Sequence, residues 1–337
     1  MIDPLGRKRM TKTVAMLLLL AAAPMMGAAP TFAQSEVKMI TFSGATNVVG
    51  WAAIDKGFFE KEGLKVTAEQ TRGSKQQMRD LMEGKYQFAS TSFDNVVAYT
   101  EGEGSDKFPD YDVVAILGVH SGLTSVVARP EIKTFADLKG KTVAVDSATS
   151  GYGTVLFKIL KDKAGLVQDK DYKVAAVGGT SDRIKAMKDN VAVAGIVSSP
   201  RDTDLQEEGY NILAEVADAI GAYQGSVFVV RRSWAKDHEK EVMAFTRGII
   251  AANDFVFKDK AGAIAVLRNR IKDLSESEAE KLYKRLTGPG GLNRRAELNA
   301  KGVGTVLELR AVYGGAKRTE PEKYIDLSYY MKATAKK

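Results

Sequence analysis

Six short stretches of this 337-residue chain are dense in glycine and hydroxyl residues, and each lies between an expected strand and an expected helix. Hydroxyl groups and the free N–H groups of helix starts bind anions, and the helix dipole strengthens the attraction. Ligands of open α/β sheets bind beyond the carboxyl ends of the strands, so these stretches should line one shared site. The candidate ligand-binding residues of the first three stretches are Ser43, Gly44, Asn47, Gly73, Ser74, Thr91, Ser92, Phe93 and Asp94. Those of the last three are Ser147, Thr149, Ser150, Gly151, Tyr152, Gly179, Thr180, Ser198 and Ser199.

Helix capping is the ordinary alternative for several of these residues. Ser, Thr and Asp often precede a helix only to accept hydrogen bonds from its first turn, and Ser74, Asp94 and Asp182 stand where they could do so. The run 147–152 is longer than a cap requires, which favours ligand contact there.

The charge of the six stretches bears on the kind of ligand. Arg72 and Arg201 are the only cationic side chains among them, and a phosphate ester should recruit more. A monoanion such as a sulfonate, a carboxylate or nitrate needs only N–H donors and hydroxyls. Asp94, if it faces the ligand, favours one that also carries an amine.

Metal and catalytic chemistry have little to build on in this chain. It has no cysteine, and His120 and His238 are its only histidines, so we expect no transition-metal site. The nucleophile motif G-x-S-x-G, the zinc motif H-E-x-x-H and the P-loop lysine motif are all missing. We therefore expect no enzyme activity and no cofactor.

Short strands alternate with helices over most of the chain, which indicates mostly parallel sheets covered by helices on both faces. The expected strands are 37–42, 65–70, 88–90, 113–118, 125–128, 142–145, 172–177, 193–197, 211–215 and 227–230. From residue 233 the periodicity becomes helical, with helices expected at 242–257, 261–270, 275–286 and 297–312. Two strand-and-helix sets and a helical tail predict two lobes, with the tail packed on the first.

The N-terminus has the features of a secretory signal peptide. Arg7, Lys8, Arg9 and Lys12 precede an apolar run over 14–23, and small residues lead to an expected cut after Ala33. Residues 1–33 carry +3 of the formal net charge of +7, so about +4 remains on the rest of the chain. Positive and negative residues are interspersed there, so nucleic-acid binding is not expected.

Two segments carry a resemblance to a known family. Residues 50–66 read GWAAIDKGFFEKEGLKV, and residues 135–145 read FADLKGKTVAV. They resemble the periplasmic substrate-binding proteins of ABC transporters, in the group of nitrate, alkanesulfonate, taurine and thiamine-pyrimidine binders. In the first segment Gly57 should end a helix and the phenylalanines should lie in the core, so this motif is not expected to contact ligand.

The resemblance implies a two-lobed type II periplasmic binding fold in which each lobe is a mostly parallel sheet flanked by helices. On this basis we expect a signal peptide at 1–33, lobe 1 at 34–122, lobe 2 at 123–225, and a return to lobe 1 with the helical C-terminal tail at 226–337. It further implies a periplasmic monomer that binds a small anionic solute, such as a sulfonate, taurine or nitrate, and delivers it to an inner-membrane permease with its ATPase.

Two alternatives remain open at this point. The ligand could be a pyrimidine of thiamine synthesis or an aromatic carboxylate. The protein could also be an enzyme on the same fold, because pyrimidine-synthesising relatives do chemistry. Those relatives use a cysteine-rich segment, and the lack of cysteine here disfavours that alternative.

Overall fold

The computed structural model describes residues 34–102, 111–314 and 320–335. The expected signal peptide over residues 1–33 lies outside the described residues. Across these described ranges, no helix has both the length and the apolar character that crossing a membrane requires.

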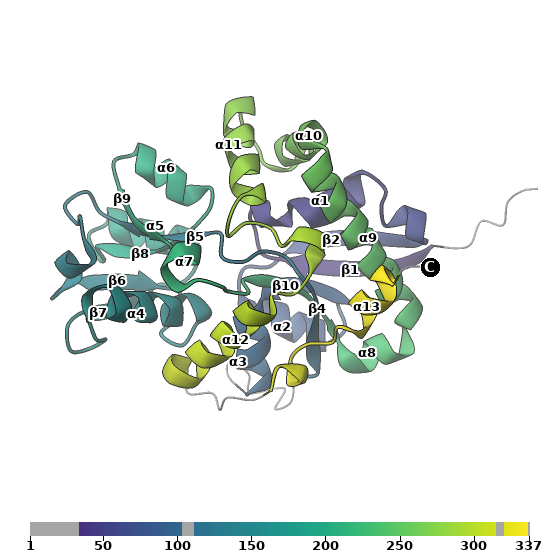
Figure 1. Ribbon diagram of the computed structural model, residues 1–337, viewed down its shortest axis with the longest axis horizontal. Coiled ribbons are helices and arrows are strands. Elements are labelled where there is room, and N and C mark those ends of the chain that lie inside the picture. Colours follow the sequence, from purple (N-terminus) through teal and green to yellow (C-terminus); the bar gives the residue numbers. More distant parts are fainter. Residues whose placement is uncertain (1–33, 103–110, 315–319, 336–337) are drawn as a thin grey trace, which may run out of the picture. The chain divides into compact units, whose positions relative to one another are not determined.

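Two five-stranded mixed sheets organise the residues from Gln34 onward (Figure 1). Sheet 1 has the order β2-β1-β3-β10-β4, with β1 at Ser35–Thr41, β2 at Leu64–Gln70, β3 at Phe88–Ser92, β4 at Val113–Gly118 and β10 at Ser226–Arg231. Sheet 2 has the order β7-β6-β8-β5-β9, with β5 at Thr124–Ala128, β6 at Thr142–Val145, β7 at Lys173–Ala176, β8 at Ala194–Ser198 and β9 at Asn211–Glu215.

Each sheet contains one strand that runs against the others, and the connections explain why. β10 pairs antiparallel with β3 and β4, and β5 pairs antiparallel with β8 and β9. The chain crosses between the sheets twice, at 119–123 and at 216–225, and each time it leaves from the carboxyl-terminal edge of the other strands. A chain that crosses by so short a route enters the next sheet at its carboxyl-terminal edge, so the entering strand must run in the opposite direction.

Helices cover the sheets on both faces, as the alternating pattern predicts. Sheet 1 carries α1 (Val48–Asp55), α2 (Ser74–Met82) and α3 (Phe93–Thr100), and sheet 2 carries α4 (Gly151–Ala164), α5 (Thr180–Lys188), α6 (Arg201–Glu207) and α7 (Val216–Ile220). The C-terminal helices are α8 (Arg232–Asp237), α9 (Glu239–Lys258), α10 (Lys260–Arg270), α11 (Glu276–Thr287), α12 (Ala300–Leu309) and α13 (Ser328–Thr334). α9 packs on α1, α10 and α13, and α10 packs on α11, so most of the tail belongs to the body of sheet 1.

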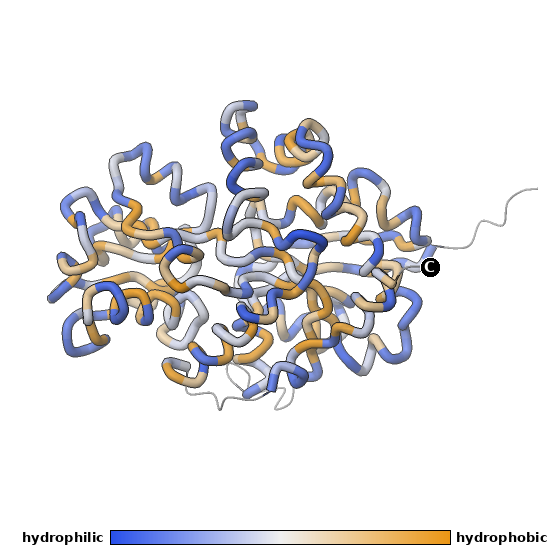
Figure 2. The backbone as a smooth tube through the Cα atoms, viewed as in Figure 1, coloured by the Kyte–Doolittle hydropathy of each residue, from blue (hydrophilic) through white to orange (hydrophobic). Residues whose placement is uncertain are grey.

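The tail does not pack on the first lobe alone. α12 lies against both α3 of the sheet 1 body and α4 of the sheet 2 body. Its buried side chains join one apolar cluster with residues of both sheets, including Val113 and Val126. Alternate residues of β10 face opposite clusters, with Val227 and Val229 in this one and Phe228 in the other. Apolar residues accordingly concentrate along the strands and inner helix faces (Figure 2).

The segment 50–66 is structural, as predicted. Gly57 has φ 68 and ends α1, and Gly63 has φ 76 at the turn into β2. Phe59 is fully buried and stacks on Phe245 of α9 with 5.1 Å between the ring centroids. This segment therefore holds α1 and α9 together.

The capping prediction is confirmed at some helices and wrong at α2 and α3. The Gly179 N–H donates to Asp182 at the start of α5 at 2.9 Å, and Ser275 and Glu278 form a capping box at the start of α11. At α2 the N-cap is Gly73, and the Gln77 amide instead donates to the Ile40 and Ser90 carbonyls. At α3 the N-cap is Ser92, so Asp94 does not cap the helix.

Candidate functional site

The carboxyl-terminal edges of the two sheets are joined by both crossings. The chain leaves sheet 1 at Gly118 and enters sheet 2 at Thr124, then leaves at Glu215 and returns at Ser226. Helices α1 to α7 each follow a strand that ends at one of these two edges, α1 through the turn Ala45–Asn47, and helix first turns direct N–H groups without intrahelical partners toward the edge. The predicted stretches therefore occupy these edges, which we call the facing edges.

Asp94 and Gly151 bring the two facing edges into direct contact. Asp94 lies in the first turn of α3 and is 3% exposed. Gly151 begins α4, and a Cβ placed on it would lie 2.6 Å from both Cβ and Cγ of Asp94. Two stretches that are 57 residues apart in sequence thus meet at this point.

Arg310, at the end of α12, completes this contact. Its guanidinium is fully buried and its Nη1 lies 3.5 Å from Oδ1 of Asp94. The same nitrogen donates to the carbonyl of Thr149. One cation from the tail thereby joins a carboxylate of the first edge to the backbone of the second.

Two tyrosines lie beside these charged groups. Burial raises the pKa of the Tyr152 hydroxyl, and a hydrogen bond with Ser198 acts in the opposite direction. Burial raises the pKa of Tyr223 well above its ordinary value, and the carboxylate of Asp94 adds to this shift. Both phenols therefore stay neutral at physiological pH and can donate hydrogen bonds.

Arg183 organises a second polar group at the edge of sheet 2. It is 1% exposed and donates to the carbonyl of Ile196 and to Oγ1 of Thr180, at 2.8 and 3.0 Å. Thr180 in turn bonds Ser198 at 3.3 Å. The Arg183 guanidinium lies 5.6 Å from the ring of Tyr152 and 4.0 Å from Asp146. Its own pKa is lowered by burial, with the nearby carboxylate opposing that shift.

The remaining predicted residues of sheet 2 have varied surroundings. Ser147 and Thr149 are exposed at the edge. Ser150 is the N-cap of α4 and accepts from the Gly153 N–H at 3.0 Å. Gly179 is the N-cap of α5, and the Ser199 hydroxyl donates to Asp202 at 2.8 Å.

The other predicted residues of sheet 1 contact their own sheet. The Asn47 amide donates to the carbonyls of Phe42 and Gly44, so it closes its own turn, and Ser43 is exposed. Ser74 accepts a hydrogen bond from Tyr99 at 3.2 Å. The buried Thr91 accepts from Asn95, and Phe93 is a core residue. Of the predicted residues of sheet 1, Asp94 is the one whose contact with the edge of sheet 2, at Gly151, is described above.

Three arginines at the facing edges lie outside the predicted stretches. Arg183 and Arg310 are fully buried, and Arg285 of α11 contacts Ser199. The sequence-based prediction that the ligand is not a phosphate ester counted only the cations of the loops, Arg72 and Arg201. It therefore missed these three arginines. A signal existed for two of them, because Arg183 stands in helical register with buried Ala186 and Met187, and Arg310 in register with Val303 and Val306.

The two crossings are fastened together at His120. The Gly122 N–H donates to Nδ1 of its ring at 3.1 Å, so Nε2 carries the proton and donates to the Ser226 hydroxyl at 3.0 Å. Gly225 packs on the ring, where a Cβ would lie 2.4 Å away. Gln224 donates to the His120 carbonyl and accepts from Asn293, which connects the crossings to the tail.

The buried His120 predicts how the free energy of unfolding depends on pH. Burial lowers its pKa from 6.5 to about 4. Between these values the unfolded chain binds a proton that the folded protein does not, so stability is lost as pH falls from 6.5 toward 4. Urea unfolding should show about 3 kcal/mol of loss from this residue over that range.

The control compares variants that remove each histidine. In His120→Gln the pH-dependent loss should shrink by that amount, whereas His238→Gln should retain it. Equal slopes for wild type and His120→Gln would contradict the assignment.

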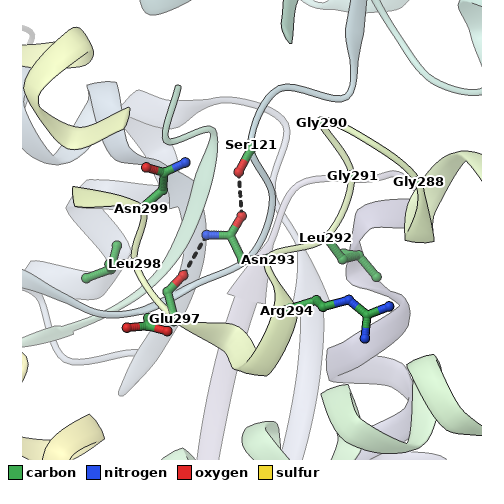
Figure 3. A pocket seen from close by; sticks show the side chains of 10 residues that line it. All are labelled: Ser121, Gly288, Gly290, Gly291, Leu292, Asn293, Arg294, Glu297, Leu298 and Asn299. Atoms are coloured by element: carbon green, nitrogen blue, oxygen red, sulfur yellow. Dashed lines mark hydrogen bonds between the residues drawn. The ribbon is translucent and has the colours of Figure 1, made fainter. Parts of the chain in front are cut away.

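A pocket of about 280 Å³ lies beside the crossings, lined by Ser121 and by residues between Gly288 and Asn299 (Figure 3). Asn293 crosses it, accepting from Ser121 at 2.8 Å and donating to the Glu297 carbonyl at 2.6 Å. A second pocket, of about 480 Å³, lies at α8 and α13. None of the predicted ligand-binding residues lines either pocket. In the described ranges, no three His, Asp or Glu side chains gather as metal ligands would.

The fold and the facing edges define a class of protein: a two-lobed α/β protein with the periplasmic binding fold. The alkanesulfonate-binding protein SsuA from Xanthomonas axonopodis pv. citri, solved bound to MOPS, has a TM-score of 0.68 and 16% identity over 89% of this chain and 97% of its own. The nitrate-binding protein NrtA from Synechocystis PCC 6803 has a TM-score of 0.74 and 12% identity over 89% and 88%. A ligand-binding component of an ABC-type import system from Staphylococcus aureus, solved with zinc bound, has a TM-score of 0.74 and 12% identity over 90% and 100%.

The chain belongs to the NMT1/THI5-like family, whose model matches residues 46–263. It is also 24% identical over 226 residues to YtlA of Bacillus subtilis (strain 168), to which a binding role has been attributed. That match covers 66% of this chain and 65% of YtlA. The predicted family and fold are therefore confirmed.

Proposed function

We propose that this protein is the periplasmic solute-binding component of an ABC importer and binds its solute between the facing edges. The contact of Asp94 with Gly151 carries the proposal, because it joins the loops of both sheets that the sequence assigns to one site. The fold it shares with sulfonate-binding and nitrate-binding proteins, and the binding role attributed to YtlA, support the same function.

A small anion, such as a sulfonate, taurine or nitrate, fits these edges best. Helices α1 to α7 begin there, and Ser147 and Thr149 present exposed hydroxyls beside the start of α4. Arg183 and Arg310 add positive charge, while Asp94 and Asp146 offset it. This balance suits a solute of low net charge, and an amine on the solute would have carboxylates to meet.

An aromatic carboxylate or a pyrimidine is the second candidate. Tyr152 lies close enough to Tyr223 to help raise the pKa of the Tyr223 hydroxyl, and Asp94 acts in the same direction on both tyrosines. A flat ligand could pack against these rings while its polar groups reach the phenol hydroxyls and Asp94.

Transport would proceed by separation and closure of the edges. Asp94 and Gly151 leave no room for a solute between them in this arrangement, so a solute enters when the edges are apart. Ligand contacts to both sheets then favour a closed form, which the permease and its ATPase recognise. Catalysis plays no part in this function. The N-terminal segment 1–33 would direct export of the protein to the periplasm, where it would act as a monomer.

A thermal-shift screen tests the function. Sulfonates, taurine, nitrate, aromatic carboxylates and pyrimidines are added separately, and the true solute should raise the melting temperature increasingly with its concentration. A solute at 100 times its Kd should stabilise the protein by about 2.7 kcal/mol. If every compound class leaves the midpoint unmoved, the proposal fails.

The variant Thr149→Asp then tests the anion. Its exposed side chain would place a negative charge at the start of α4, so affinity for an anionic solute should fall at least about tenfold. Thr67→Asp is the matched control, because Thr67 is exposed on β2 away from the facing edges. Equal affinities of the two variants would remove Thr149 from the site.

A further inference from the structure

α11 has two faces that contact different bodies of the protein. Its apolar residues Ala279, Leu282 and Leu286 are buried, and the two leucines join the core cluster of sheet 1. The helix packs on α10 and on the turn Ala45–Asn47, which is part of the first facing edge. α11 is therefore bound to sheet 1 by apolar contact.

A second face of α11 presents two cations to sheet 2. Lys281 and Arg285 are four residues apart and so lie on one side of the helix. Lys281 pairs with Glu207 of α6 at 3.2 Å, and Arg285 pairs with Glu215 at the end of β9. These contacts cross from one body to the other on the α6 side of the molecule (Figure 1).

Sheet 2 has a preformed receiving group for Arg285. Asp202 is fully buried, and it accepts hydrogen bonds from Ser125 at 2.7 Å and from Ser199 at 2.8 Å. Arg285 lies 3.6 Å from this carboxylate and 3.4 Å from the hydroxyls of both serines. Both serine hydroxyls and the Thr203 N–H donate to Asp202, so this carboxylate keeps hydrogen-bond donors of its own sheet when Arg285 moves away and water enters.

The two sides of the facing edges differ in the kind of contact that closes them. On the far side, α12 packs on α3 and α4 through Val303, Val306 and Leu307, all at most 4% exposed. Opening that side would expose apolar surface to water. On the α11 side, the helix is largely hydrophilic (Figure 2), and Lys281 is 69% exposed and Arg285 22% exposed, so water can replace their partners.

We propose that Arg285 and Lys281 form a latch that closes the facing edges, and that the edges part on the α11 side while α12 stays packed. The latch keeps a fraction of the ligand-free molecules in the closed form. After a solute binds, the latch slows its release. This inference rests on the proposed function, because it describes the closure that solute binding would use.

Distances between spin labels test the latch in the ligand-free protein. The chain has no cysteine, so Gln206→Cys on α6 and Lys272→Cys before α11 can be labelled specifically. The double change Arg285→Gln and Lys281→Gln should lower the ratio of short to long distances about fivefold. Raising NaCl from about 0.05 to about 1 M should shift wild type in the same direction, because salt screens ion pairs.

Controls separate the latch from a general effect on charge or folding. Lys284→Gln removes one positive charge from an exposed position on α11 and should leave the distances unchanged. Glu215→Gln removes a partner of Arg285 on sheet 2 and should shift the distances in the same direction as the double change. A second label pair, Lys161→Cys on α4 and Glu308→Cys on α12, should keep its distance in every variant.

Two results would overturn the latch: distances in the double variant equal to those in Lys284→Gln, or opening at the α4 and α12 labels. Neither measurement needs a solute. A failed thermal-shift screen with an intact latch would count against the proposed function alone, and a successful screen with no latch would count against this inference alone.

Discussion

Arg310→Met is expected to lower the free energy of unfolding by about 3 kcal/mol, because it removes one partner from a buried ion pair. Asp94 is 3% exposed, and Arg310 is its fully buried cationic partner at 3.5 Å. Methionine fills much of the same volume but leaves the carboxylate and the Thr149 carbonyl without the guanidinium. Urea denaturation of the two proteins measures the difference.

A surface arginine supplies the matched control for this prediction. Arg268 on α10 lies 3.6 Å from Glu276, and its side chain is 46% exposed. Arg268→Met should change stability by less than about 1 kcal/mol. Asp94→Asn added to Arg310→Met should recover more than half of the loss, since a neutral amide then replaces the buried carboxylate charge. Equal losses for the two arginine variants would show that the buried pair stabilises no more than a surface one.

Gly151→Ala is expected to weaken solute binding roughly 100-fold, or about 2.7 kcal/mol, while the protein still folds. A Cβ at this position would lie 2.6 Å from Cβ and Cγ of Asp94, so the facing edges must move apart by about 1 Å. Gly151 has no left-handed backbone angle, so alanine causes no strain within α4 itself. Titration with the solute found by the thermal-shift screen measures the loss.

Gly304→Ala is the control for the methyl group. Gly304 also lies in a helix, but a Cβ there would meet no atom within 4 Å. This variant should bind as wild type does and gain about 0.5–1 kcal/mol of stability, because alanine favours helix more than glycine. Unchanged affinity in Gly151→Ala would mean that binding does not require this close approach.

The core pattern of the fold is readable from local sequence. Each of the ten strands in the described part of the chain overlaps an expected strand, because side-chain alternation along a strand is a local property that does not depend on its partners. The last long helix begins at Ala300 and not at 297, since Asn299 caps it by accepting from the Gly302 N–H at 3.0 Å. The tail's second contact, between α12 and α4, was not predicted, because an apolar helix face does not specify which surface will cover it.

The candidate site also has a part that local sequence predicted and a part that it did not. Glycine, serine and threonine after strands predicted the edges at which ligands would bind, since strand and helix ends are local properties. They did not reveal that Arg183, Arg285 and Arg310 lie at those edges, because these residues come from helix interiors and from the tail.

By itself, the sequence determined the positions of the strands and most helices, the family, and the loops at the carboxyl ends of the strands. The tertiary structure alone decided that Asp94 meets Gly151, that α12 packs between α3 and α4, and that α11 contacts sheet 2 through charged residues. The physical reason is range: hydrogen bonding and apolar periodicity act over a few neighbouring residues, whereas these contacts join segments from 57 to more than 150 positions apart.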